Sequence, residues 1–226
     1  MALLLILLLV FLVVAFSLGA ILKKGVERVA PTATQVDVKL KNAEVWLLAW
    51  RIQLSGFVLG NPPGCRTPSS IEVANVNVRF KPGSLFSDKI VVDTIKIKAP
   101  IITLEGGLRD NNLKKIEKNL DDYVGSSKSR KPERKLQVND LVITDAMLQV
   151  NLTILGGRTI NLPVPDIHLT DLGTGPEGIT ALEVGQKALH AELNAVTKEM
   201  AKNASQLGGD GGVIKNAADR LKGLFH

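Results

Sequence analysis

The stretch DKIVVDTIKIKAPIITLEGG, residues 88–107, decides the fold class because its apolar residues recur at every second position. Polar or charged residues fill the positions between them, so that Ile95, Ile97, Ala99 and Ile101 alternate with Thr94, Lys96 and Lys98. A period of two is typical of a β-strand that buries one face. Pro100 has no backbone N–H to donate, which predicts a free edge or a bulge at that position.

The same alternation recurs on both sides of this stretch. It is found in residues 35–41, 44–64, 69–83, 135–143, 147–155 and 158–165. We take residues 44–64 as one run, which ends at the turn sequence NPPG, and Gly156-Gly157 as a two-residue hairpin turn. Strands with one apolar face must cover that face, so we expect one sheet with helices, a lipid chain or another subunit packed against it.

Three segments change to helical spacing, which makes the fold class α+β. Residues 111–124 form the first, and a basic linker at 126–135 separates it from the next strand. In residues 179–204 one stripe contains Leu182, Leu189, Leu193, Val196 and Met200, and we place Glu192 among the charged residues around that stripe. Residues 213–225 form a last amphipathic piece. Such C-terminal helices dock on their own domain, on a membrane surface or on a partner.

The first segment of the chain predicts a membrane anchor. Residues 2–22 carry no charge, and at ~1.5 Å per residue they span roughly 31 Å, close to the ~30 Å hydrocarbon layer. Representative anchor residues are Leu3, Leu9, Phe11, Val14 and Phe16. A cleaved signal peptide has a basic start and an apolar run of about 7–15 residues, and neither feature is present here. Cleavage after AFS at 15–17 is the alternative.

The charge pattern favours anionic surfaces and gives a weak signal for orientation. The net charge is +6, and Lys23, Lys24 and Arg28 follow the apolar segment, which by itself favours a cytoplasmic body. The linker is a solvated connection or, alternatively, a basic patch. The candidates for contact with lipid headgroups are Lys23, Lys24, Lys128, Arg130 and Lys131. Aromatic residues are 4% of the chain and no nucleic-acid-binding motif is present, so we expect no nucleic-acid partner.

Catalytic and metal-binding patterns are weak. The stretch PDIHLTD brings Asp166 and His168 within ~7 Å on one side of a predicted strand, but a metal site needs a third ligand. Cys65 is the one cysteine, and no nucleophile elbow or phosphate loop is present. We therefore expect no catalytic residue, no metal, no cofactor and no enzymatic activity, and we interpret residues 163–173 as a strand followed by a turn.

Five stretches, taken in order, resemble a known family. They are GVERVAPTATQVDV, FVLGNPPGCRTPSS, SLFSDKIVVDTIKIKAPIITLEGG, NNLKKI and VPDIHLTDLG. Together they are similar to small bacterial members of the AsmA family, membrane-anchored proteins with a β-groove. The resemblance implies a single anchor in the inner membrane, a periplasmic body, and a curved, taco-like antiparallel sheet with an apolar concave face. It divides the chain into an anchor and stem (1–30), a sheet domain (31–178) and C-terminal helices (179–226).

Lipid handling is the leading functional interpretation. For the orientation, the resemblance outweighs the three basic residues after the apolar segment, so we expect the body of the protein in the periplasm. The candidate groove residues are Val76, Val78, Phe80, Ile95, Ile97, Leu148, Val150 and Leu152. The groove would bind or shield phospholipid and support the lipid homeostasis of the envelope, although a sheet of seven to nine strands is too short to bridge a periplasm. The alternative is a structural or assembly subunit, whose apolar face and C-terminal helices contact other envelope proteins or copies of the same chain. A hydrolase or metal enzyme is the third hypothesis.

Overall fold

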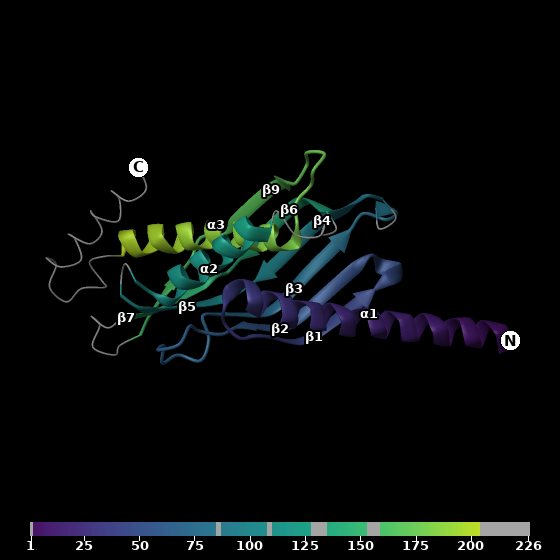
Figure 1. The fold of residues 1–226 in the computed structure, drawn as a ribbon, viewed down its shortest axis with the longest axis horizontal. Helices are drawn as coiled ribbons and strands as arrows, with labels where there is room; N and C mark the ends of the chain where they lie inside the picture. The colour runs from purple at the N-terminus through teal and green to yellow at the C-terminus, as the bar shows by residue number, and fades with distance from the viewer. Residues whose placement is uncertain (1, 85–86, 108–109, 128–134, 153–158, 204–226) are drawn as a thin grey trace, which may run out of the picture.

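The computed structural model describes residues 2–84, 87–107, 110–127, 135–152 and 159–203, and the side chains of residues 2–16 and 152 lie outside this description. Helices and strands follow one another along the chain as shown in Figure 1. In order they are α1 (Ala2–Thr34), β1 (Val38–Trp46), η1 (Leu47–Ala49), β2 (Arg51–Leu59), β3 (Ile71–Phe80), β4 (Lys89–Lys98), β5 (Ile101–Gly106), α2 (Asn112–Ser127), β6 (Lys135–Thr144), β7 (Met147–Leu152), β8 (Ile160–Pro163), β9 (Ile167–Leu172) and α3 (Ala181–Lys202). The fold is therefore α+β.

All nine described strands belong to one curved sheet, which does not close (Figure 1). β1, β2 and β3 are antiparallel neighbours, and β3 then pairs with β4 over its C-terminal part and with β5 at its first residues. The expectation of an antiparallel sheet is wrong in two places, because β4 pairs parallel with β6 and β5 pairs parallel with β7. The cause is the long connection between β5 and β6, which contains α2 and returns the chain to the end of the sheet where β4 began.

A line of irregular backbone crosses the sheet where β4 gives way to β5 and β6 gives way to β7. Ala99 and Asp145 have φ values of 50° and 57°, and the Ala99 N–H donates to the carbonyl of Thr144 at 2.8 Å. The predicted interruption at Pro100 is confirmed, since β4 ends at Lys98 and β5 begins at Ile101. At this break the alternation of the two faces shifts by one residue. The apolar residues before and after the break therefore lie on the same side of the sheet, the side that faces the helices.

Helix α3 covers one face of the sheet. It begins at a capping box, in which Thr180 and Glu183 bond to each other's backbone amides. Two hydrophobic clusters form beneath it. One joins Val196 and Met200 to Ile102, Leu104, Leu148, Val150, Leu162 and Val164, and the other joins Val184 to Val92, Val138, Leu141, Ile143 and Ile167. The predicted helix at 179–204 is thus confirmed, and its apolar stripe is used within the chain.

Helix α2 fills the space between α3, α1 and the sheet. It confirms the helix predicted at 111–124, but it ends three residues later, at Ser127, so that its last two residues belong to the predicted linker. Ile116 packs with Val36, Val38 and Leu59, while Leu120 and Val124 pack with Ala33 at the end of α1. Residues 128–134 of the linker and the amphipathic piece at 213–225 lie outside the described residues.

Helix α1 lies along the free edge of β1, antiparallel to that strand. The Glu27 carboxylate accepts the Leu40 N–H at 3.0 Å, Lys23 Nζ donates to the Lys41 carbonyl at 3.1 Å, and Gly19 lies against the backbone of Ala43. Edge strands are usually protected from pairing with other chains, and here α1 provides that protection. The N-terminal part of α1 projects beyond the sheet (Figure 1).

The stem of α1 ends later than the sequence indicated. We expected it to end near Pro31, but α1 continues through Pro31 to Thr34. Proline removes one helical N–H bond, yet the next turn stays helical because Gln35 N–H donates to the Pro31 carbonyl at 2.8 Å. The Thr34 hydroxyl also bonds the Ala30 carbonyl at 2.8 Å.

The predicted membrane anchor is not tested by the described side chains. Within the described part of the chain, no helix is long and apolar enough to cross a membrane. The five representative anchor residues, Leu3, Leu9, Phe11, Val14 and Phe16, have side chains outside the description.

Candidate lipid-binding surface

Two rows of apolar side chains cross six neighbouring strands on the face that carries α3. Each residue pairs directly with the next one in the sheet register. The first row, ladder A, is Ala43–Leu54–Val76–Ile97–Ile143–Ile167, and the second, ladder B, is Val45–Ile52–Val78–Ile95–Leu141–Leu169. At ~4.8 Å between strands, each row is roughly 24 Å long. The pairing therefore builds a continuous hydrocarbon surface from β1 to β9.

The burial of these ladders changes along their length. On β1, β2, β3 and β4 all eight side chains are only half-buried, whereas Leu141 and Ile143 on β6 and Ile167 on β9 are buried. Helix α3 explains the difference, because its residue Val184 packs on the β6 and β9 part. In Figure 1 neither α2 nor α3 reaches the part of β3 and β4 nearest the N-terminal end of α1. The chain thus leaves apolar area partly open between α1 and α3.

The groove residues predicted from the sequence fall into three groups. Val76, Val78, Ile95 and Ile97 lie on the half-buried part of the ladders, and Phe80 is half-buried one position beyond ladder B. Leu148 and Val150 are fully buried beneath α3. Leu152 ends β7, and its side chain is not described. We therefore restrict the candidate lipid-contacting surface to the first group.

In the half-buried part of the ladders, four residues were absent from the predicted set: Ala43, Val45, Ile52 and Leu54. We took residues 44–64 as one run, but the structure folds the chain back at η1, so that β1 and β2 form a hairpin. The alternation of apolar and polar residues in this region did indicate a strand with one apolar face. The turn was missed because residues 46–50, WLLAW, include none of the usual turn formers.

The opposite face of the same strands is polar. Gln53, Asn77 and Lys96 form one row across β2, β3 and β4, and Arg51, Arg79 and Thr94 form another. The contrast between neighbouring residues such as Val76 and Asn77 makes the sheet strongly two-sided.

The stretch that suggested metal chemistry is part of this polar face. β9 confirms the predicted strand, with Ile167 buried and His168 exposed on the other side. His168 Nε2 hydrogen-bonds the Asp140 carboxylate, and Asp166 accepts the Asp145 N–H at 3.2 Å. The described residues contain no cluster of three or more His, Cys, Asp and Glu side chains that is arranged to hold a metal ion.

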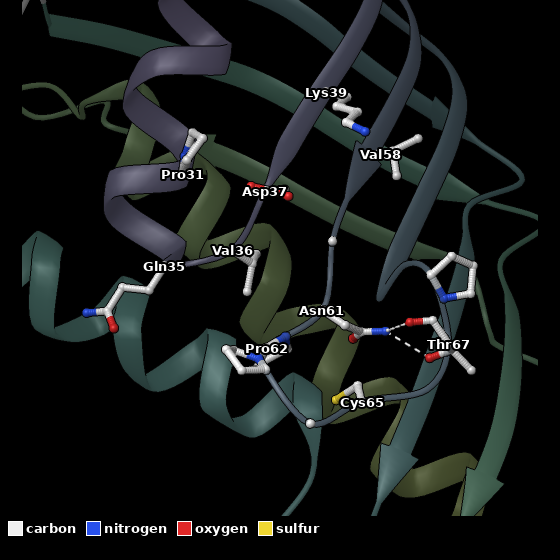
Figure 2. Close-up of a pocket in the computed structure, with 14 residues that line it drawn as sticks. Pro31, Gln35, Val36, Asp37, Lys39, Val58, Asn61, Pro62, Cys65 and Thr67 are labelled. Carbon is white, nitrogen blue, oxygen red and sulfur yellow. Dashed lines mark hydrogen bonds between the residues drawn. The ribbon is translucent and has the colours of Figure 1, made fainter.

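A separate cavity of about 570 Å³ lies where α1, β1 and β2 meet the loop at 60–68 (Figure 2). The Glu105 carboxylate fixes this loop, since it accepts the Arg66 and Thr67 amides and the Thr67 hydroxyl. Burial opposes ionisation of Glu105, but these hydrogen bonds outweigh it and lower the pKa of the carboxyl. Asn61 donates to Thr67 across the loop, as Figure 2 shows.

The thiol in this cavity is poorly suited to nucleophilic chemistry. Burial and the nearby charge of Glu105 both raise the pKa of Cys65. A raised pKa reduces the thiolate fraction, which is the reactive species.

Glu192 is a buried carboxyl that the sequence placed on the wrong side of its helix. It lies on the stripe Val184, Ala188, Glu192, Val196 and Met200 at intervals of four residues, and its side chain is 6% exposed. Neither carboxylate oxygen has a hydrogen-bond partner among the described residues. Burial raises the pKa of Glu192 to about 7.

The candidate headgroup residues are dispersed. Lys24 is exposed, whereas Lys23 is engaged with the Lys41 carbonyl and lies 3.9 Å from the Glu27 carboxylate. Lys128, Arg130 and Lys131 lie outside the described residues.

Comparison with known proteins gives one match. The model of the AsmA family matches residues 1–174, which include all strands of the sheet. No curated protein and no solved structure matches the chain.

Proposed function

The chain belongs to the AsmA family, and from this premise we propose that it is a membrane-anchored protein that binds lipid hydrocarbon on the half-buried part of its two ladders. Membership of this family indicates a membrane-related role in the cell envelope. The phospholipid ligand, the inner-membrane location and the periplasmic position of the sheet are parts of the proposal.

The uncharged segment at residues 2–22 supports the anchor. Its length matches the hydrocarbon layer, and Lys23 and Lys24 follow directly at the level expected for headgroups. We propose that this segment crosses the inner membrane once and that α1, continuing along β1, holds the sheet beside the bilayer.

The burial change along the ladders is the observation that supports lipid binding. The same rows of Val, Ile and Leu are sealed by α3 on β6 and remain half-buried on β1 to β4. Removing apolar area from water is favourable by about 25 cal/mol per Å². An acyl chain that covers these strands would therefore be stabilised in its bound position. This role is one of binding and shielding, without catalysis or a cofactor.

An assembly subunit is the alternative function. The same half-buried ladders offer apolar area to a helix of another envelope protein or of a second copy. Helix α3 is already packed on its own sheet, so this alternative relies on the ladders and on residues beyond 203.

Site-specific photo-crosslinking in intact membranes separates these possibilities. A photoreactive residue at position 76 should form adducts with phospholipid, and the same residue at position 77 on the opposite face should form none. Protein adducts at position 76 in place of lipid adducts would favour the assembly subunit. Equal labelling at positions 76 and 77 would contradict both functions for the ladders.

A further inference from the structure

Helix α3 covers the β6 and β9 part of the ladders with small side chains. In the cluster beneath it, α3 contributes one buried valine, Val184, and three partly buried alanines, Ala188, Ala191 and Ala195. The free energy gained on burial scales with apolar area, so alanines hold a helix on a sheet only weakly. The family match also ends at residue 174, so α3 lies outside the matched residues, which contain the whole sheet.

An acidic side chain lies within this small-residue face of α3. Glu192 follows Ala188 by one turn, between Val184, which contacts the ladders, and Val196, which contacts the other cluster of the sheet. Its side chain is buried, and neither carboxylate oxygen has a hydrogen-bond partner among the described residues. Burial of an ionised carboxylate without a partner is costly. The closed position of α3, in which it packs on the sheet, therefore requires a neutral carboxyl.

The groups that face Glu192 from the sheet do not compensate for this burial. The described positions of β4, β5, β6, β7 and β9 that pack against α3 are apolar, because the polar residues of these strands alternate to the other face. On α3 itself, Glu199 lies two turns further along the same side, where it accepts a hydrogen bond from Asn203 at 2.7 Å. Burial alone raises the pKa of Glu192.

The charged residues of α2 lie on another side of α3. His190 Nε2 is 2.8 Å from the Asp121 carboxylate and 3.7 Å from the Glu117 carboxylate, and Lys114 lines a small hollow between the two helices. The imidazole forms ion pairs only while it is protonated, and histidine side chains change charge near neutral pH. These pairs therefore favour the closed position at lower pH, in the same direction as the buried carboxyl.

The start of α3 is fixed to the sheet and can serve as a hinge. Ile179 and Leu136 exchange two backbone hydrogen bonds of 2.8 and 2.7 Å, and Thr180 caps the helix directly after them. A Cβ at position 178 would lie 2.9 Å from the Leu136 carbonyl oxygen, so the backbone is held close at this point. At ~1.5 Å per residue, Glu192 lies roughly 18 Å beyond the cap. A rotation of α3 about Ile179 would thus separate Glu192 from the sheet.

We propose that α3 is a lid on the ladders, which stays closed while the Glu192 carboxyl is neutral and opens about Ile179 when this carboxyl ionises. Opening uncovers Ile143 on β6 and Ile167 on β9, and it extends the open part of the ladders from four strands to six. The use of this added surface rests on the proposed lipid binding, whereas the movement of α3 does not.

The expected size of the effect follows from the two environments of the carboxyl. The pKa of Glu192 is about 7 in the closed position and has an ordinary value of 4.5 in water. The closed position is therefore favoured most below about pH 4.5, and this preference is lost as the pH rises through about 7. Full ionisation should raise the ratio of open to closed molecules by up to about 300-fold, of which about 70-fold falls between pH 5 and pH 8.

Thiol labelling in the full chain measures this opening without lipid. Ile143→Cys places a thiol beneath α3, and Val38→Cys places one in the buried cluster of β1 as a control, both in a Cys65→Ser background. Each labelling rate is divided by that of a free thiol in a short peptide at the same pH. From pH 5 to pH 8 the corrected rate at position 143 should rise by about 70-fold, and the rate at position 38 should rise much less. Equal rises at both positions would show general unfolding and overturn the lid.

Variants of α3 assign the opening to its buried carboxyl. In the Ile143→Cys chain, Glu192→Gln and Glu192→Leu should both keep the corrected rate at pH 8 near its value at pH 5, whereas the exposed control Glu177→Gln should not. His190→Gln should retain most of the response to pH. A full response in both Glu192 variants, or its loss in His190→Gln alone, would overturn the role of Glu192.

Photo-crosslinking in intact membranes tests what the opening uncovers. A photoreactive residue at position 169, on the β9 end of ladder B, should form phospholipid adducts at pH 8 and few at pH 5, while position 76 should form them at both. Adducts at position 76 but none at position 169 at pH 8 would overturn the link between the lid and lipid. An absence of lipid adducts at both positions would contradict the proposed function, and thiol labelling would still decide whether α3 opens.

Discussion

The Glu27 carboxylate of α1 accepts the backbone N–H of Leu40 in β1 at 3.0 Å. This bond links a helix that begins in the uncharged N-terminal segment to the outermost strand of the sheet. It satisfies an edge amide that would otherwise face another chain or water, and it fixes the distance between α1 and the ladders. The attachment of the sheet to α1 is therefore part of the fold.

Replacing Glu27 should weaken this attachment. Glu27→Leu removes the acceptor and should lower the free energy of unfolding by about 1–2 kcal/mol, measured by urea denaturation of the full chain in detergent. Glu27→Gln retains a carbonyl oxygen and should lose less. Glu44→Leu, on an exposed position of the same strand, is the control. Equal effects of Glu27→Leu and Glu44→Leu would show that the bond contributes nothing.

The close approach of α1 and β1 depends on a glycine. A Cβ at position 19 would lie 2.2 Å from the Ala43 carbonyl oxygen, whereas a Cβ at position 25 meets nothing within 4 Å. Gly19→Leu should therefore push the helix from the strand and destabilise the chain by about 1–3 kcal/mol. Gly25→Leu should be neutral or stabilising, because leucine is the better helix former. Thermal unfolding of both variants under the same conditions tests the difference, and equal melting temperatures would refute the contact.

The sequence predicted the sheet, its two-sidedness and the helices α2 and α3 because these depend on local periodicity. The parallel pairs were missed because the neighbour of a strand depends on the route of the chain through α2, and strand alternation carries no such information. The turn between β1 and β2 was not predicted because its residues are apolar. Glu192 was predicted to lie outside the buried stripe because it is charged. The interval of four residues along α3 nevertheless puts its side chain in a buried position.

Glu192 should make the stability of the fold depend on pH. Its folded pKa is raised to about 7, so the folded state holds a proton that the unfolded state, with a pKa of 4.5, releases earlier. The contribution of protonated Glu192 to the free energy of unfolding is fully present below about pH 4.5 and is lost as the pH rises through about 7. The change is about 3 kcal/mol at most. Denaturation at pH 5 and pH 8 should show this loss in the wild type. Glu192→Gln should flatten it, and Glu177→Gln, at an exposed position, should not.

The pair of His168 and Asp140 should be dispensable for lipid binding. Both side chains lie on the polar face, where the ring is largely exposed and solvent weakens their interaction. His168→Ala, Asp140→Ala and, in the same stretch, Asp166→Ala should leave phospholipid crosslinking at position 76 unchanged. A loss of crosslinking in folded His168→Ala protein would restore a functional role to this stretch.

Two valines on the same face of the sheet separate lipid binding from stability. Val76 is half-buried on ladder A, whereas Val150 is fully buried beneath α3. Valine to threonine keeps the shape and the strand preference of the side chain but replaces one methyl group by a hydroxyl, whose transfer from water into an apolar environment is unfavourable. Val150→Thr should therefore lower the free energy of unfolding by about 1–3 kcal/mol, since its hydroxyl is removed from water. Val76→Thr should change stability much less and should reduce the phospholipid that co-purifies with the full chain, measured by native mass spectrometry. If Val76→Thr kept its lipid while remaining folded, the half-buried part of the ladders would not be the surface that binds hydrocarbon.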